Sequence, residues 1–116
     1  MVVLPEYRVA YFTVTEEELK KYNSQTGDTE GIVNYGLQIE GIVMSIIIVD
    51  RPEAVKMSFR SVEEFAVNQL ASKYFNGGGH KNASGGKTTG IGLQATIDKL
   101  MSVLPEYQEA LLAVKN

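Results

Sequence analysis

The segment from Phe75 to Lys87 holds the residues whose types and spacing could do chemistry. Three consecutive glycines, Gly77 to Gly79, lead into His80, the one histidine of the chain, and two more glycines follow at positions 85 and 86. Glycine has no Cβ, so it tolerates positive φ and lets a ligand approach the backbone. Successive N–H groups can then converge on an anion, and histidine adds a donor that can carry charge near neutral pH. This pattern predicts a phosphate-binding loop.

The distribution of charge around this segment supports that prediction. No Asp or Glu occurs between Phe65 and Ile97, although the whole chain carries a net charge of −3. The basic residues of that window are Lys73, His80, Lys81 and Lys87. A local positive field in an acidic protein favours a small anionic ligand over a long duplex. Arg60, upstream, adds a guanidinium that could pair with a phosphate through two parallel hydrogen bonds.

Two structural interpretations of the same residues stay open, whereas two known nucleotide-binding motifs do not match their spacing. Clustered glycines also mark ordinary turns, and Arg60 could be a solvated charge at a sheet edge. A P-loop requires a glycine five residues before Gly86, where this chain has Lys81, and a dinucleotide-binding fingerprint requires one where Asn82 stands. A single histidine and scattered acids provide no ligand set at metal-binding spacing. No metal site is therefore expected within the chain.

Hydrophobic patterning predicts one α/β domain with a mixed sheet of about four strands and helices packed on it. Tyr7 to Val14 is an expected strand, and the apolar run from Ile42 to Val49 should be a strand covered on both faces. Val55 to Arg60 alternates and should form a hairpin with that run across Arg51-Pro52-Glu53. A further short strand is expected within Ala83 to Thr89.

The helices are predicted from capping signals. Thr15 with Glu18, and Ser61 with Glu64, match the capping box, in which a hydroxyl and a glutamate satisfy the first N–H groups of a helix. The second box should open the helix that leads to the glycine segment and carries Asn68 as a solvated amide. The other expected boundaries are a first helix ending near Tyr22, a polar turn from Asn23 to Gly27, a cap at Asp28 or Thr29, a helix opening at Gly92 and a separate helix from Pro105 to about Val114.

Composition sets further bounds on the class of protein. The 116 residues are 44% hydrophobic and 22% charged, which is typical of a soluble globular domain large enough for its own core. Without cysteine there is no disulfide, thiolate metal site or thiol nucleophile. No apolar run approaches a membrane span, and no signal peptide is recognised. A cytoplasmic protein is expected, and its net negative charge argues against general nucleic-acid coating.

Residues 77 to 85, Gly-Gly-Gly-His-Lys-Asn-Ala-Ser-Gly, resemble the Gly-Gly-Gly-His-x-x-Ala-x-Gly signature of the DHH-associated domain. That domain is the C-terminal half of DHH-family phosphoesterases. Ser58-Phe-Arg-Ser61 and Val67-Asn68 agree with the resemblance, which extends from about Ile42 to Leu100. The most similar branch is exopolyphosphatase-related and has oligoribonuclease and 3′-phosphoadenosine 5′-phosphate phosphatase activity.

The resemblance implies roles for particular residues. Residues 1–116 would form the substrate-binding domain, and the catalytic DHH domain, with its manganese, would be absent because the chain has no Asp-His-His. The chain alone is therefore expected to be inactive, with no catalytic and no metal-binding residue. Phosphate binding is implied for Arg60, Gly77, Gly78, Gly79 and His80. Secondary contacts are expected from Ser61, Lys81, Asn82 and Ser84.

The implied function is to hold the phosphates of short oligoribonucleotides or of 3′-phosphoadenosine 5′-phosphate while a DHH domain hydrolyses the phosphoester. The expected partners are that nucleotide or RNA substrate and the DHH domain, with no membrane, and a homodimer is left open. Two alternatives stay beside it. One is the equivalent domain of a single-strand exonuclease or tRNA-related enzyme, and the other is a stand-alone nucleotide- or nucleic-acid-binding module.

Overall fold

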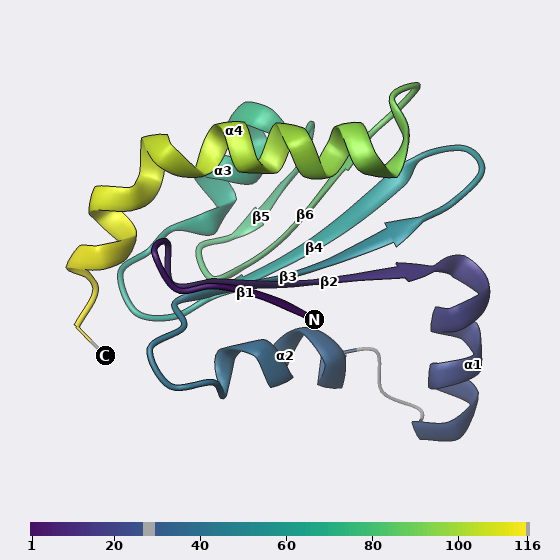
Figure 1. Cartoon of the computed structure of the whole chain (residues 1–116), viewed down its shortest axis with the longest axis horizontal. Coiled ribbons are helices and arrows are strands. Elements are labelled where there is room, and N and C mark those ends of the chain that lie inside the picture. Colours follow the sequence, from purple (N-terminus) through teal and green to yellow (C-terminus); the bar gives the residue numbers. More distant parts are fainter. Residues whose placement is uncertain (27–29, 116) are drawn as a thin grey trace.

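The computed structural model describes residues 1–26 and 30–115, which form one six-stranded sheet with four helices (Figure 1). The strands are β1 (Val2–Leu4), β2 (Val9–Thr15), β3 (Met44–Asp50), β4 (Val55–Ser61), β5 (Gly78–His80) and β6 (Ala83–Thr88). The helices are α1 (Glu16–Thr26), α2 (Glu30–Leu37), α3 (Val67–Tyr74) and α4 (Gly92–Ala113). The predicted α/β class with a mixed sheet is confirmed, but the sheet has six strands rather than about four.

The strand order is β1-β2-β3-β4-β6-β5, and one neighbouring pair is parallel. β2 and β3 run in the same direction, from Val9 opposite Met44 to Thr15 opposite Asp50. Parallel neighbours need a crossover connection, and α1 and α2 lie within that crossover. The remaining neighbours are antiparallel. The expected hairpin between β3 and β4 is among them.

β3 lies in the middle of the sheet and is covered on both faces. Residues Met44 to Val49 are all buried, as the uninterrupted apolar run predicts. On β4 every second residue from Val55 to Ser61 is buried. The residues between them, from Lys56 to Arg60, face the other side of the sheet because side chains alternate along a strand. The alternation predicted for this segment is confirmed, and it decides which face Arg60 occupies.

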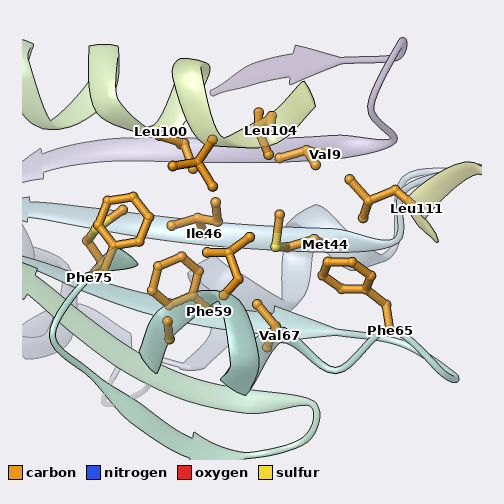
Figure 2. Packing of buried hydrophobic residues seen from close by; sticks show 14 of the residues in the cluster. Val9, Met44, Ile46, Phe59, Phe65, Val67, Phe75, Leu100, Leu104 and Leu111 are labelled. Carbon is orange, nitrogen blue, oxygen red and sulfur yellow. The ribbon is translucent and has the colours of Figure 1, made fainter. Parts of the chain in front are cut away.

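The larger core lies between the sheet and helices α3 and α4, which Figure 1 shows above the strands. Leu100 and Leu104 point from α4 toward the sheet, where Ile46 lies beneath them (Figure 2). The rings of Phe59 and Phe75 have centroids 5.8 Å apart, which joins β4 to the end of α3. Removing this apolar surface from water is the main stabilising term of the fold. Phe75, the first residue of the glycine segment, is therefore held in this core.

A smaller core lies on the opposite face, where α1 and α2 cover β2 and β3 (Figure 1). Leu19 and Val33 from these helices pack with Ile47 and Val49 of β3. On the same face, Ala83, Gly85 and Lys87 of β6 and Gly78 and His80 of β5 are all exposed or half-buried. This half of the face is consequently open over β5 and β6, whereas α2 also contacts β4.

One predicted capping box is confirmed and the other is wrong. At the start of α1, the Glu18 N–H donates to Thr15 Oγ1 at 3.0 Å and the Thr15 N–H donates to Glu18 Oε1 at 2.8 Å. Ser61 belongs instead to β4, where it lies opposite Met44. Its hydroxyl donates to the Phe65 carbonyl at 2.7 Å, and α3 begins only at Val67 without a side-chain cap.

Other boundaries differ from the predictions for local reasons. The strand expected from Tyr7 begins at Val9, because Arg8 takes a φ of 58° that interrupts the extended chain. α1 continues to Thr26, so the polar turn expected from Asn23 to Gly27 is wrong over its described part. Polar residues on an exposed helix face do not stop a helix that is already capped. The caps expected at positions 28 and 29 lie outside the described residues.

Pro105 was expected to open a new helix, but it lies within a single helix, α4. Proline removes a hydrogen bond and kinks a helix, and Figure 1 shows the last turns of α4 angled away from its first half. Leu104 and Leu111, on either side of the proline, are both fully buried in the same core. The packing of these two leucines on the sheet therefore keeps α4 continuous across Pro105.

The Arg8 side chain, near the N-terminal end, forms hydrogen bonds with backbone carbonyls near the C-terminal end of the described chain. Its Nε donates to the Gly41 carbonyl at 2.7 Å, and its Nη1 donates to the carbonyls of Leu111 at 3.2 Å and Val114 at 2.7 Å. The C-terminal end of a helix has carbonyls without intrahelical partners, and a guanidinium satisfies several of them at once. The arginine therefore serves as the cap of α4 from the other end of the sequence.

Candidate functional site

Backbone hydrogen bonds fix the start of the glycine segment at the end of α3. Phe75 is fully buried, and the Lys87 N–H donates to its carbonyl at 2.7 Å. Asn76 has a φ of 50°. The N–H groups of Phe75 and Gly77 both donate to the Ala71 carbonyl, at 3.0 and 3.1 Å, which ends the helix with a left-handed cap. The chain therefore leaves α3 in one direction, toward β5.

Gly77, Gly79 and Gly86 are required by close packing of the backbone. A Cβ on Gly77 would lie 1.8 Å from the Gly85 carbonyl oxygen. On Gly86 it would lie 2.9 Å from the Phe75 Cβ. Gly79 has a φ of 142°, which side chains rarely allow, and its Cβ would come within 2.8 Å of the β6 backbone. These three glycines let β5 and β6 pack against each other and against the end of α3.

Residues Gly78 to His80 form strand β5 rather than a loop. β5 pairs with β6 around the two-residue turn at positions 81 and 82, with His80 opposite Ala83. Neighbouring N–H groups of a strand point to opposite edges, and the Gly77 N–H already caps α3. Three successive N–H groups therefore do not converge on one point. An anion here would meet side chains and the outward N–H groups of an edge strand.

Arg60 and His80 lie in one row across the sheet, with Ala83 between them. Arg60 is opposite Ala83, and Ala83 is opposite His80, so all three side chains point to the same face. Two strand spacings separate the outer Cα atoms by about 10 Å, and the small Ala83 leaves the space between them clear. Arg60 is half-buried, and its Nη1 donates to the Phe59 carbonyl at 2.8 Å. His80 is exposed. The guanidinium of Arg60 and the imidazole of His80 can thus approach one ligand group.

The expected secondary contacts Ser61, Asn82 and Ser84 are engaged within the protein. The Asn82 amide donates to Ser61 Oγ at 2.9 Å and to the Phe65 carbonyl at 3.2 Å. The Ser84 hydroxyl donates to the His80 carbonyl at 2.9 Å, and both serines are buried. These bonds hold the turn between β5 and β6 against the end of β4. The structure therefore gives these side chains a part in positioning His80.

Asn68 also contacts the glycine segment, although a solvated amide was expected there. Its Nδ2 lies 3.4 Å from the Gly79 carbonyl, a long hydrogen bond. Its Oδ1 is buried and finds no partner within residues 1–26 and 30–115. Asn68 sits on the second residue of α3, so the helix holds this amide against the edge strand. The expectation of a solvated side chain is corrected.

Two lysines on the open face complete the basic surface. Lys56 of β4 lies directly opposite Lys87 of β6, and both are exposed. They share the face of Arg60 because Lys56 is four residues before it on the same strand. The sequence prediction counted Lys87 as nearby charge but did not include Lys56. The signal was present in the alternation of β4, which puts residues 56 and 60 on one side.

Groups with shifted pKa values lie on the other face of the sheet, between α3 and α4. A hydrogen bond from the Tyr74 hydroxyl, and then one from Lys73, lower the pKa of Glu106. The same carboxylate raises the pKa of Lys73. Burial raises the pKa of Tyr107, which lines a groove of about 480 Å³ beside the end of α4. These groups join two helices and do not face Arg60 or His80.

The described residues do not bring together three His, Asp or Glu side chains that could hold a metal ion. Manganese therefore does not fit this part of the chain. In the same residues, no helix combines the length and the apolar character needed to cross a membrane.

Comparison with known families decides what kind of domain this is. The model of the DHHA1 domain, the DHH-associated domain, matches residues 6–110, nearly the whole chain. The chain belongs to the DHHA1 domain family. The matched range contains every phosphate-binding and secondary residue inferred from the sequence, from Arg60 to Ser84. The resemblance seen in the glycine-histidine motif is thereby confirmed.

Two relatives are more than 30% identical to this DHHA1 domain over the matched region. The chain is 32% identical over 79 residues to the bifunctional oligoribonuclease and PAP phosphatase NrnA of Thermus thermophilus, covering 68% of the chain and 23% of that protein. It is 37% identical to the crystal structure of an exopolyphosphatase-related protein from Bacteroides fragilis, with a TM-score of 0.82 over 95% of the chain and 32% of that structure. The DHHA1 domain thus spans between about a quarter and a third of these relatives.

More distant structures share the fold alone. A pGpG-specific phosphodiesterase, PggH, from a Vibrio species has a TM-score of 0.58 at 19% identity, covering 90% of this chain and 34% of that one. The C-Ala domain of alanyl-tRNA synthetase from Aquifex aeolicus has a TM-score of 0.52 at 15% identity, covering 90% of this chain and 91% of that one. At such identities the likeness favours no particular activity for this DHHA1 domain.

Proposed function

We propose that this DHHA1 domain holds the phosphates of short oligoribonucleotides or of 3′-phosphoadenosine 5′-phosphate for a phosphoesterase. The observation that carries the proposal is the row in which Arg60 and His80 flank Ala83 on an open sheet face. Strands β4, β5 and β6 contain no Asp or Glu. The activity named for the Thermus relative supports this choice of ligand.

The two side chains suit a terminal phosphate for different reasons. A guanidinium presents a fork of N–H donors that matches two phosphate oxygens, and the hydrogen bond is strengthened by both charges. Imidazole adds one donor whose strength rises when it is protonated. Because His80 stands on a strand and Arg60 on another, their separation is fixed by the sheet. That arrangement would favour a ligand with a free phosphate end over the interior of a long strand.

Hydrolysis itself we assign to a DHH domain outside residues 1–116 that carries manganese. The relatives are roughly three to four times longer than the region they share with this chain. A pair of metal ions would stabilise the attacking and leaving oxygens, while this chain binds and orients the substrate. With manganese and 3′-phosphoadenosine 5′-phosphate added, the 116-residue chain alone should release no phosphate. Metal-dependent release by the chain would contradict this assignment.

The binding proposal is tested by titrating the chain with 3′-phosphoadenosine 5′-phosphate while amide NMR spectra are recorded. The amides of β5, β6 and the end of β4 should shift together and saturate. His80→Ala should weaken binding by roughly 1–3 kcal/mol, since a charge-assisted hydrogen bond is lost. Arg60→Lys should weaken it as well, because lysine cannot form the two-pronged contact.

A matched control variant removes one positive charge from a position outside strands β4, β5 and β6. Lys115→Ala takes a cation from the C-terminal segment, which is exposed and far from this row in the sequence. It should leave the affinity within about twofold, since Lys115 belongs to none of β4, β5 and β6 and an exposed charge is screened by salt. If Lys115→Ala weakens binding as much as His80→Ala does, the attraction is general and the site is not the one proposed.

A further inference from the structure

Two glycines on the open face are not required by the fold. A Cβ on Gly78 would meet nothing within 4 Å, and one on Gly85 would meet only the Met57 carbonyl oxygen at 3.6 Å, an ordinary contact. Neither residue has a φ in the left-handed region. Their neighbours Gly77 and Gly86 differ, because a Cβ on either would collide with other atoms. Packing therefore does not account for the absence of side chains at positions 78 and 85.

The register places these glycines side by side. Ser58 of β4 is opposite Gly85, and Gly85 is opposite Gly78. This row lies two residues along β4 from the Arg60 row and two residues from the Lys56 row, all on one face. Two adjacent strands thus present bare backbone, with one small serine beside them. We call Ser58, Gly85 and Gly78 the glycine floor, and a flat ring can lie on it at van der Waals distance.

Beyond the floor, Lys56 and Lys87 form a pair of like charges. They are cross-strand partners, and like charges directly opposite each other destabilise a sheet. Neither lysine makes a side-chain hydrogen bond or ion pair within the part of the chain that the structure describes. No carboxylate on β4, β5 or β6 offsets the repulsion. An anionic ligand group between the two ammonium groups would relieve it.

The distance between the two basic ends sets the length of the ligand. Four residues separate Arg60 from Lys56, which is about 14 Å along an antiparallel strand. At the stacked rise of about 3.4 Å per nucleotide this equals about four steps, and fewer in a more extended strand. A mononucleotide with one phosphate, such as AMP, can occupy only one of the two basic ends. A strand of a few nucleotides is long enough to occupy both.

We propose that Lys56 and Lys87 form a second phosphate subsite, with the glycine floor carrying a nucleoside between it and the Arg60–His80 row. This inference rests on the proposed function, because the first phosphate anchor is the one proposed there. It adds a length preference: the chain binds a short single-stranded oligonucleotide more tightly than a mononucleotide. The added affinity depends on the lysine pair and falls with salt.

The lysine pair is tested with two ligands, AMP and the 5′-phosphorylated trinucleotide pApApA, by isothermal titration calorimetry at several salt concentrations. The double variant Lys56→Gln/Lys87→Gln should bind the trinucleotide about tenfold more weakly and bind AMP within twofold of the original chain. Losing one phosphate contact should also reduce the salt slope of trinucleotide binding by about 0.7. The control variant Lys20→Gln/Lys115→Gln removes the same charge from α1 and from the C-terminal segment, outside β4, β5 and β6, and should change neither affinity.

The floor is tested by Gly78→Val, which adds a side chain above the bare strand. Its melting temperature should stay near that of the original chain, because the space beside Gly78 is empty. Its affinity for pApApA should fall at least tenfold, while its affinity for inorganic tripolyphosphate, which has no ring, should be unchanged. Wild-type trinucleotide affinity in a folded Gly78→Val variant would overturn the floor.

The outcomes separate this inference from the proposed function. If the lysine variant binds both ligands like the original chain while His80→Ala weakens both, the second subsite is wrong and the proposed function stands. If the original chain binds neither AMP nor pApApA at millimolar concentration, the proposed function fails and the second subsite fails with it. A loss confined to pApApA supports the subsite.

Discussion

Gly77 and Gly78 are adjacent residues of the same type, yet a methyl group would meet different surroundings at each. At position 77 a Cβ would overlap the Gly85 carbonyl, and at position 78 it would enter open space. Both are glycines of the same motif, but only Gly77 is needed for β5 and β6 to pack. A substitution at Gly77 should therefore lower the stability, whereas a substitution at Gly78 should affect ligand binding without lowering the stability.

We expect Gly77→Ala to lower the free energy of unfolding by about 2–3 kcal/mol, because the backbone must shift to remove the overlap. Gly78→Ala should keep the stability or raise it by up to about 1 kcal/mol, since alanine restricts the unfolded chain. Urea denaturation of both variants measures the difference. Equal losses would show that β5 is more tightly enclosed than the structure indicates.

At the scale of elements, one sequence pattern has two different outcomes. Thr15-x-x-Glu18 closes a capping box at α1, whereas Ser61-x-x-Glu64 does not cap a helix. Glu18→Ala should destabilise the protein by about 0.5–1 kcal/mol, because the Thr15 N–H loses its acceptor. Glu64→Ala should change the stability by less than about 0.5 kcal/mol, as is usual at exposed sites. Thermal unfolding of the two variants provides a matched comparison.

The contact between α3 and α4 should depend on pH through Glu106. The Tyr74 hydroxyl and Lys73 lower the pKa of its carboxyl below the ordinary 4.5. A lowered folded-state pKa stabilises the protein above pH 4.5, and this contribution is lost as the pH falls through the folded value. The melting temperature of Glu106→Gln should therefore be lower than that of the original chain at pH 7, and the gap should narrow as the pH falls below 4.5 toward pH 3.

Glu109→Gln, one turn further along α4, is the control for Glu106→Gln. Glu109 is exposed and makes no side-chain hydrogen bond or ion pair within residues 1–26 and 30–115. Its substitution should shift the melting temperature little at either pH. A gap for Glu106→Gln that stays constant between pH 7 and pH 3 would mean that the carboxylate charge contributes nothing to the helix contact.

The elements that were predicted correctly are those whose burial imposes a period on the sequence. β3 is apolar throughout because both faces are covered, and β4 alternates because only one face is. β1 and β5 were missed since three residues cannot show a period, and two residues of β5 are glycines with no side chain to alternate. Ser61 misled the helix prediction because its hydroxyl and backbone are satisfied by β4 and Phe65 instead.

At the scale of the whole molecule, the motif was recognisable from the sequence but its setting was not. The residues that carry the proposed site lie near one another because β6, not β5, pairs with β4. No local pattern distinguishes these two ways of adding a hairpin to a sheet edge. The order that occurs puts Ala83 between Arg60 and His80, and it puts Gly85 between Ser58 and Gly78, which forms the glycine floor.

Arg8 joins segments that are far apart in the sequence, so its substitution should change the stability of the whole fold. Arg8→Ala should lower the free energy of unfolding by about 2–3 kcal/mol, because carbonyls at Gly41, Leu111 and Val114 lose a charged donor. Arg8→Gly should lose somewhat less, since glycine accepts the φ of 58° without strain. Lys20→Ala, which removes an exposed ion pair with Glu16, should cost less than about 0.5 kcal/mol.

The hydrogen bonds of Arg8 also have a consequence for the order of events during synthesis. They join positions 103 and 106 residues apart in the sequence, and β2, which follows Arg8 directly, pairs with β3. On a ribosome, the first strands can meet early, but the guanidinium has to wait until the last turn of α4 has been made. A nascent chain stalled before Leu111 would therefore expose an arginine that the finished protein holds against its final helix.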